Sequence, residues 1–383
     1  TGHNVSEISR SDSLAFNLDA TASEIFNVIE YSKKNKKKSI CFITGVPGAG
    51  KTLAGLNIAN ATQNTETYEE NAVFLSGNGP LVIVLQEALA RDDVLSSREH
   101  GNPIRKTEAL NKSKAFIQNI HHFRDEYIKD ENAPIEKIVI FDEAQRAWTQ
   151  EQTTSFMKQR KGIDDFNMSE PEFLIGVMDR HDDWAVIICL IGGGQEINKG
   201  EAGLPEWFSA LKENYQNWKI WVSPELNDFE YNMGNNLYDD LNHGVLEEKG
   251  KLHLSISVRS FRSEKVSEFV KSLLDIDTKA SHLLNQLNGK YPIAITRNFD
   301  LAKSWLREKS RGTERTGILA SSGAVRLKPH GINAKNEIDP RHWFLNGKDD
   351  IRSSFYLEDV ATEYAVQGLE LDWVGVVWDG DFV

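Results

Sequence analysis

Residues 45–52 read GVPGAGKT; they follow the apolar run SICFIT (39–44) and precede LAGLNIANAT (53–62). The stretch satisfies the pattern G-x-x-x-x-G-K-[ST] at every fixed position. Glycines allow the backbone to curl so that successive N–H groups point at an anion, and a helix beginning near Lys51 adds the positive end of its dipole. The strand–loop–helix order therefore predicts a phosphate-binding loop. The alternative is a glycine-rich turn without a ligand.

The side chains of this loop have expected roles in nucleotide binding. Lys51 would reach the β- and γ-phosphates, and the Thr52 hydroxyl would ligate Mg²⁺. The residues of the loop that we expect to bind the nucleotide are Gly45, Pro47, Gly48, Ala49, Gly50, Lys51 and Thr52. The implied cofactors are a nucleoside triphosphate and Mg²⁺.

A second candidate element is the sequence IVIFDEAQ at residues 138–145. Its apolar residues predict a buried strand, and Asp142 emerges at the end of that strand. Asp142 would hold the Mg²⁺, directly or through water, and Glu143 would polarise the attacking water. The alternative is an acidic helix start stabilised by the helix dipole. Because the phosphate loop is intact, the pair favours a nucleoside triphosphatase.

Composition limits the class of protein. The chain has 383 residues, of which 40% are hydrophobic and 26% charged, so two globular domains are expected. No apolar stretch approaches the length needed to cross a bilayer. Cys41 and Cys189 both lie in apolar, strand-like runs and are interpreted as small buried hydrophobes in a reducing, cytoplasmic compartment. A net charge of −13 argues against a broad non-specific grip on nucleic acid, although a local basic groove remains compatible with it.

Short β-branched and aromatic runs alternate with helical patterns, which predicts an α/β fold with parallel sheets flanked by helices. The predicted strands are SICFITG (39–45), AVFLSG (72–77), EKIVIFDEA (136–144), AVIICLIGG (185–193), WKIWVS (218–223), KLHLSISV (251–258), YPIAIT (291–296), TGILAS (316–321) and WVGVVW (373–378). The predicted helices are 53–61, 81–90, 113–125, 264–274 and 298–309. We expect residues 1–20 to be a linker or the end of an upstream domain, 21–228 a first domain, 229–250 a connector and 251–383 a second, incomplete domain.

A glutamine follows another predicted strand, in the sequence GGGQE at residues 192–196. Gln195 on this strand-end loop could reach the γ-phosphate and report its loss. The alternative is a loop side chain that faces water.

The order of six motifs resembles that of superfamily 1 helicases and, more narrowly, of the Schlafen-related helicase-like ATPases of bacteria. The motifs are GVPGAGKT (45–52), FLSGNGPL (74–81), DEAQ (142–145), GGGQE (192–196), LSISVRSFRS (254–263) and ATEYAVQGLELD (361–372). The resemblance covers about residues 39 to 372. It implies two RecA-like P-loop NTPase domains that hydrolyse ATP.

The resemblance also implies roles for residues of the second domain. Arg262 or Arg259 would reach across to the γ-phosphate and stabilise the transferring phosphoryl group, the alternative being a basic residue at a strand end. Gly368 would let the backbone approach a ligand, while Glu370 and Gln367 would face the interdomain cleft. For these three residues the alternative is an ordinary turn before a strand.

Single-stranded DNA or RNA is the partner that the resemblance implies. Ser76 and Asn78 occupy the place of a strand contact in the first domain. Trp148, Trp207 and Trp343 are candidates for base stacking, with core or interface packing as the alternative. Three features depart from the family pattern. GGGQE lacks an aspartate, and no adenine-reading glutamine precedes the loop. No arginine-bearing last motif follows the fifth motif before Val383, so either the sequence is a truncated fragment or that element is absent.

Two functions therefore stay open. The first is an ATP-driven helicase or translocase module, within an anti-phage defence protein as the resemblance implies. The second is an ATP-dependent switch that controls a fused or partner nuclease without processive unwinding. Neither function involves a membrane. The sequence does not decide whether the nucleic acid is DNA or RNA, or in which direction the protein would move along it.

Overall fold

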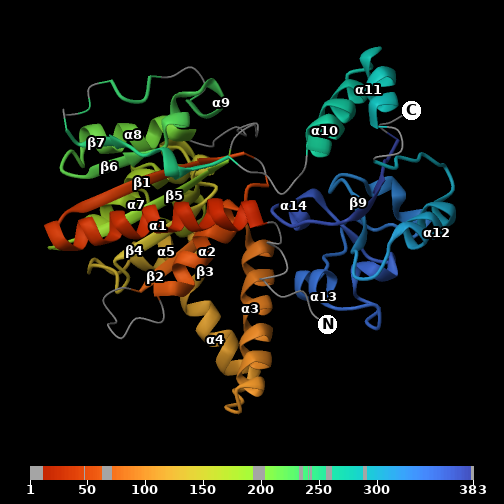
Figure 1. Cartoon of the computed structure of the whole chain (residues 1–383), viewed down its shortest axis with the longest axis horizontal. Coiled ribbons are helices and arrows are strands. Elements are labelled where there is room, and N and C mark those ends of the chain that lie inside the picture. Colours follow the sequence, from red (N-terminus) through yellow and green to blue (C-terminus); the bar gives the residue numbers. More distant parts are fainter. Residues whose placement is uncertain are drawn as a thin grey trace. The chain divides into compact units, whose positions relative to one another are not determined.

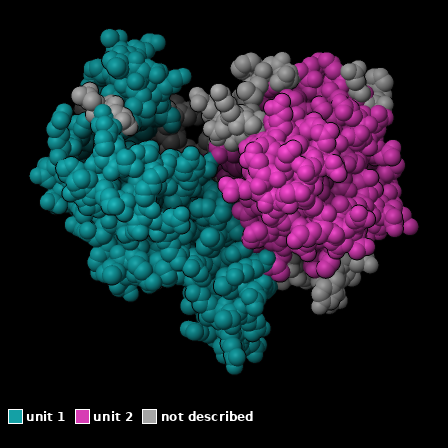
Figure 2. All heavy atoms as spheres, turned by 180° about the vertical axis from the view of Figure 1, so that it is seen from behind, with its two compact units in different colours: residues 1–8, 78–114, 260–383 teal, residues 9–77, 115–259 magenta. Residues whose placement is uncertain are grey.

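The computed structural model describes residues 12–46, 48–62, 71–192, 203–232, 236–239, 241, 244–255, 261–287 and 291–380. Side chains at 12–16, 229–230 and 261–264 are excluded from the description. The chain forms two compact units (Figure 2). The P-loop unit comprises Ser9–Gly77 and Ala115–Arg259, and the C-terminal unit comprises Thr1–Ile8, Asn78–Lys114 and Ser260–Val383.

The P-loop unit is built on a parallel sheet with the strand order β3-β2-β4-β5-β1-β6-β7, to which β8 adds by pairing with β1 (Figure 1). The strands are β1 (Lys38–Gly45), β2 (Ala72–Ser76), β3 (Ile117–Asn119), β4 (Ile138–Asp142), β5 (Ala185–Gly192), β6 (Lys219–Val222), β7 (Leu246–Glu248) and β8 (His253–Leu254). Every residue of β2 and β4 is buried, as expected for parallel strands covered on both faces.

Helices cover both faces of this sheet. The helices of the unit are α1 (Asp12–Asn35), α2 (Lys51–Thr62), α5 (Ile120–Tyr127), α6 (Gln150–Phe156), α7 (Glu170–Asp179), α8 (Gly203–Glu213) and α9 (Phe229–Asn232), with 3-10 helices at Ala144–Arg146, Pro224–Asn227 and Gly250–Leu252 and a π-helical turn at Met157–Lys161. Phe42 and Phe141 belong to the core that includes residues of α5, α7 and α8. Phe74 and Ile140 instead lie against Gly55 of α2. Neighbouring residues of a strand therefore pack against different helix layers.

The C-terminal unit contains a smaller parallel sheet with the order β10-β9-β11. Its elements are α3 (Gly79–Glu99), α4 (Lys106–Phe116), α10 (Phe261–Leu274), α11 (Lys279–Leu287), α12 (Phe299–Lys309), β9 (Thr316–Ala320), a 3-10 helix at Val325–His330, α13 (Pro340–Leu345), a 3-10 helix at Ser354–Tyr356, β10 (Val360–Ala361), α14 (Glu363–Val366) and β11 (Trp373–Val377). Leu306 of α12 and Ile318 of β9 share one small core. Figure 1 shows α10 and α11 as a helical pair and α3 as a long single helix.

The predicted α/β class with parallel sheets is confirmed, but one predicted strand lies elsewhere. His253 and Leu254 of the predicted strand KLHLSISV form β8, which pairs with β1 in the P-loop unit and not with the second sheet. The expected connector at 229–250 contributes α9 and also β7, which pairs with β6. The pattern of hydrophobic residues predicts that a segment is a buried strand. Which sheet contains that strand depends on its pairing with strands that are distant in sequence. The segment 78–114, expected within the first domain, clusters with the C-terminal segments.

Two further expectations about secondary structure are wrong. Residues 291–296 form no strand, and Ile295 is 85% exposed. The helix expected at 113–125 is divided into α4, β3 and α5. The reason is tertiary, because Ile117 pairs with Phe74 of β2 and Asn119 then caps α5 through its side chain.

Both cysteines are buried and free, as the sequence predicts. Burial raises the pKa of the Cys41 and Cys189 thiols well above their usual range, so each behaves as a small apolar residue. Within the described residues, no helix combines the length and apolar character that crossing a membrane requires.

Candidate nucleotide-binding site

The loop between β1 and α2 has the backbone that the motif predicts. Gly48 and Gly50 have φ angles of 75° and 82°, a region that favours glycine because it lacks Cβ. The Ala49 N–H donates to the Val46 carbonyl over 3.1 Å, so the loop is curled before the helix begins at Lys51. Pro47 lies outside the described residues.

Gly45 is required for a close approach within the fold. A Cβ added there would lie 2.8 Å from Cβ of Leu254, and the Val46 N–H donates to the Leu254 carbonyl over 3.1 Å. β8 therefore packs directly on the entrance to the loop. The sequence motif explains this glycine through a ligand, whereas the structure supplies an additional packing reason.

The Lys51 side chain contacts the first two residues of the loop. Its Nζ donates to the Gly45 carbonyl at 2.6 Å and lies 3.3 Å from the Val46 carbonyl. Both acceptors are neutral main-chain oxygens, which hold a cation less strongly than a carboxylate or phosphate does. These two contacts hold the ammonium group beside the loop.

Thr52 and Asp142 meet although 90 residues separate them in sequence. Thr52 Oγ1 donates to Asp142 Oδ1 over 3.1 Å. Thr52 is in the first turn of α2, and Asp142 ends β4, which is separated from β1 by β5 alone. A hydroxyl and a carboxylate at this spacing form the type of oxygen donor set that Mg²⁺ prefers. The residues present therefore fit a Mg²⁺ ion.

The Asp142 carboxyl is buried, with 8% of its surface exposed. Burial in the first place, and then the Glu143 carboxylate, raise the pKa of Asp142 to about 7. The Thr52 hydrogen bond and the Lys51 charge oppose this shift. A bound cation would act in the same direction as Lys51 and favour the ionised form of Asp142.

Gln145 is a residue of this site to which the sequence reasoning assigned no role. Its side-chain Nε2 donates to Glu143 Oε2, and its Oε1 accepts from the Gly192 N–H over 3.1 Å. Gln145 therefore connects the expected base to the end of β5, immediately before the segment that contains Gln195. The available signal was the glutamine that ends DEAQ. Glu143 itself has a φ of 53°, a conformation that is uncommon outside glycine.

Several expected residues cannot be placed in this site. Gln195 and Arg259 lie outside the described residues, and so does the side chain of Arg262, whose backbone is in α10. Gly368 and Glu370 belong to the C-terminal unit. Their proposed roles stay predictions.

Asn78 and Gly368 are brought together within the C-terminal unit. The Asn78 side chain accepts from the Leu81 N–H at the start of α3 and donates through Nδ2 to the Gln367 carbonyl. Gly368 has a φ of 77°, and a Cβ there would lie 3.1 Å from Cδ2 of Leu81. In this structure α3 is the element that approaches Gly368. Ser76, at the end of β2, is buried and pairs in register with Asp142.

The three tryptophans considered for base stacking serve packing instead. Trp207 and Trp343 are both 0% exposed. The Trp207 Nε1 donates to the Ala144 carbonyl over 2.9 Å and so supports the turn after Asp142. Trp148 is partly buried beneath the Arg124 guanidinium, 5.0 Å from its ring centroid. The packing alternative holds because indole rings gain more from burial than from exposure at a surface.

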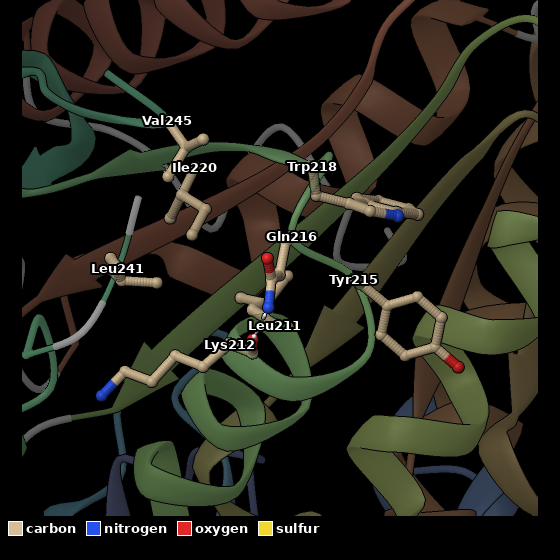
Figure 3. A pocket seen from close by; sticks show the side chains of 8 residues that line it. All are labelled: Leu211, Lys212, Tyr215, Gln216, Trp218, Ile220, Leu241 and Val245. Atoms are coloured by element: carbon tan, nitrogen blue, oxygen red, sulfur yellow. Dashed lines mark hydrogen bonds between the residues drawn. The ribbon is translucent and has the colours of Figure 1, made fainter. Parts of the chain in front are cut away.

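A small cavity lies beside β6 and β7, away from the phosphate loop, and Figure 3 shows its lining. Its volume is about 10 Å³, enough for one water molecule and far too small for a nucleotide. Its walls are Leu211, Lys212, Tyr215, Gln216, Trp218, Ile220, Leu241 and Val245. This cavity is a packing defect under the sheet edge and takes no part in the candidate site.

Comparisons with known proteins add the family. No curated protein matches the chain significantly. Among solved structures, the Hef helicase domain of Pyrococcus furiosus is similar over 92% of this chain and 88% of that chain, with 14% sequence identity and a TM-score of 0.29, a likeness too weak to support an argument. The family described as "Schlafen group 3, DNA/RNA helicase domain" matches residues 38–383. That match spans both units, and the chain therefore belongs to the Schlafen group 3 DNA/RNA helicase domain family.

Proposed function

We propose that this chain is an ATP-hydrolysing module of a nucleic-acid helicase or translocase. The observation that carries the proposal is the 3.1 Å contact between Thr52 Oγ1 and Asp142 Oδ1, next to a loop curled by Gly48 and Gly50. A hydroxyl, a buried carboxylate and a lysine converge there from two segments of the chain, the start of α2 and the end of β4. This is the arrangement that phosphoryl transfer from a magnesium-bound triphosphate requires.

Each residue then has one task. ATP, when bound with Mg²⁺, supplies the phosphoanhydride bond that is hydrolysed. Lys51 would leave the Gly45 and Val46 carbonyls to bind the β- and γ-phosphates, while Thr52 and Asp142 hold the metal. Glu143 would accept a proton from the attacking water, and Gln145 would keep the Glu143 carboxylate oriented for that transfer.

The second unit would complete the site during turnover. We propose that Arg262, or Arg259, provides positive charge to the γ-phosphate and that Gln195 responds to its loss. An arginine supplied from a separate unit would couple hydrolysis to a change of conformation. These assignments rest on the order of the motifs. Gly368 and Glu370 remain candidate nucleotide contacts on the same ground.

Charge distribution suggests which unit binds nucleic acid. The P-loop unit carries 33 of the 57 Asp and Glu residues but only 21 of the 44 Lys and Arg residues. The C-terminal unit carries 24 acidic and 23 basic residues. A phosphate backbone is repelled less by the second unit, so we propose that this unit supplies most of the grip on a single strand.

The test is ATP turnover by the full chain with and without single-stranded DNA or RNA. We expect turnover to require Mg²⁺ and to rise when a single strand is added. Lys51→Ala should abolish turnover and leave the circular-dichroism spectrum and melting temperature of the chain nearly unchanged. Turnover that persists in Lys51→Ala would contradict the site, whereas turnover indifferent to both nucleic acids would contradict the motor.

A second candidate function is an ATP-dependent switch that controls a fused or partner nuclease. The acidic excess of the P-loop unit favours it, because extended tracking along a nucleic acid benefits from positive charge. Strand displacement that is lost in Glu143→Gln would exclude this switch. A cytoplasmic role in defence against phage is a further proposal for either function, and it rests on the family resemblance.

A further inference from the structure

The C-terminal unit has a second, larger cavity that the nucleotide-binding motifs do not include. Its volume is about 290 Å³, near the lower limit for pockets that bind small molecules. The lining residues are Arg307, Ser310, Thr316, Lys348, Phe355 and Tyr356. Arg307 and Ser310 come from the end of α12 and Thr316 begins β9. The cavity therefore lies at the amino edge of the second sheet.

The charge at this cavity is positive and uncompensated within the described residues. Arg307 and Lys348 donate to main-chain carbonyls, of Tyr356 over 2.9 Å and of Gly312 over 3.2 Å, and neither makes an ion pair there. None of the six lining residues is acidic. Each cation thus keeps donors available for a ligand, since a guanidinium has five and an ammonium three.

A third cation lies directly behind the cavity wall. The Arg315 guanidinium is 4.5 Å from the Phe355 ring centroid and only 6% of the residue is exposed. Its side-chain partners are neutral: the Trp343 and Asn346 carbonyls and the hydroxyls of Ser353 and Ser354. Burial lowers the pKa of Arg315 to about 10, which leaves it charged at neutral pH. The Asp372 carboxylate, which accepts from the Arg315 backbone N–H over 2.6 Å, partly offsets this charge. Arg315 therefore contributes mainly by holding Phe355 in place.

Thr316 supplies a hydroxyl to the cavity wall. Only 2% of the residue is exposed, and the side chain lines the cavity. Its oxygen is not among the buried polar atoms that lack a partner, so the hydroxyl carries no cost of unpaired burial. The hydroxyl can donate one hydrogen bond to a polar ligand or accept one from it.

We propose that this cavity binds one nucleoside monophosphate group, with its phosphate on Arg307 and Lys348 and its base against Phe355 and Tyr356. The two cations match a phosphate, and the two rings match a flat base. Thr316 and Ser310 are the residues that would hydrogen-bond the base or sugar. The ligand is either a free mononucleotide or one nucleotide of a single strand, which share this chemistry. The site is separate from the phosphate loop and does not depend on ATP hydrolysis.

The test uses the full chain carrying Lys51→Ala, so that binding at the phosphate loop is suppressed. Calorimetric titration with adenosine 5′-monophosphate, with inorganic phosphate and with a short single-stranded oligonucleotide gives three dissociation constants. We expect the double substitution Arg307→Ala and Lys348→Ala to weaken binding of the monophosphate or the oligonucleotide about tenfold or more. Thr316→Val, which keeps the shape of the side chain, should weaken it about threefold. Lys279→Ala in α11, whose side chain is 79% exposed, is the matched control and should change nothing.

Each outcome decides a part of the proposal. Loss of monophosphate binding in the double variant identifies a free nucleotide as the ligand, and loss for the oligonucleotide alone identifies a strand. Inorganic phosphate binding as tightly as the monophosphate would overturn the role of the aromatic wall. Unchanged constants in a double variant whose melting temperature matches that of Lys279→Ala would overturn the site altogether. If the double variant unfolds, Thr316→Val carries the decision alone.

Discussion

Gly55 is a point of very close approach between the main sheet and α2, the helix that carries Lys51 and Thr52. A Cβ added at Gly55 would lie 2.8 Å from Leu190 Cδ1, 3.0 Å from Phe74 Cε2 and 3.1 Å from Ile140 Cγ2. All three neighbours are buried, at 0% or 1% exposure. No neighbour can move into solvent, so Gly55→Ala must displace either the helix or the sheet residues.

The size of the effect follows from two opposing contributions. Replacing glycine by alanine within a helix stabilises it by about 1 kcal/mol through intrinsic propensity. Overpacking a close-packed core costs about 1–3 kcal/mol. The three contacts of 2.8, 3.0 and 3.1 Å place Gly55→Ala in the upper part of that range, at about 2–3 kcal/mol. We expect overpacking to prevail by about 1–2 kcal/mol. For a unit of this size that lowers Tm by about 2–8 °C.

Thermal unfolding of the full chain, followed by circular dichroism, measures this change. Gly250→Ala is the matched control, because a Cβ there meets nothing within 4 Å, and its Tm should stay within about 1 °C of the parent chain. If Gly55→Ala instead raises Tm, helix propensity exceeds overpacking and the reasoning about α2 is refuted. Reduced ATP turnover below the melting range is also expected, since a shifted α2 moves Thr52 away from Asp142.

Three other predictions concern the P-loop unit. Gln145→Leu should lower kcat for ATP about tenfold or more with little change in KM, because it removes the hydrogen bond to Glu143 and leaves the phosphate loop intact. Gln150→Ala, which replaces an exposed glutamine, is the control and should leave both constants unchanged. A change in KM as large as the change in kcat would contradict a positioning role for Gln145. Burial, and then the Arg124 charge, lower the pKa of His121 to about 4, whereas its pKa in the unfolded chain is near 6.5. Between pH 6.5 and pH 4 the histidine is therefore protonated in the unfolded state but not in the folded state. Stability should therefore fall by about 2 kcal/mol as pH decreases from 6.5 to 4, a slope that His121→Phe should flatten in urea titrations. Arg124→Met should destabilise the chain by about 3–5 kcal/mol, since it leaves the buried Glu170 carboxylate without its cation; a loss below 1 kcal/mol would refute that pairing.

Local sequence was sufficient for the features that depend on neighbouring residues. The glycines and the lysine of residues 45–52 predicted the curled loop, because a positive φ and the start of a helix are decided within a few residues. The apolar runs predicted β1, β4, β5 and β9, because a parallel strand buried on both faces requires continuous hydrophobic residues. Asp142 and Glu143 were predicted from their place after one of those strands.

Long-range pairing decided the rest. The sequence could not show that β8 joins β1, that residues 291–296 lack a strand partner, or that Trp207 and Trp343 are core residues, because hydrophobicity does not specify which surface covers a segment. The link from Glu143 through Gln145 to Gly192 likewise depends on β4 and β5 lying side by side. Sequence alone thus determined which chemical groups are candidates for binding a nucleotide. Only the tertiary structure decided which of them meet, since the contact of Thr52 with Asp142 spans 90 residues and forms when separate strands align in one sheet.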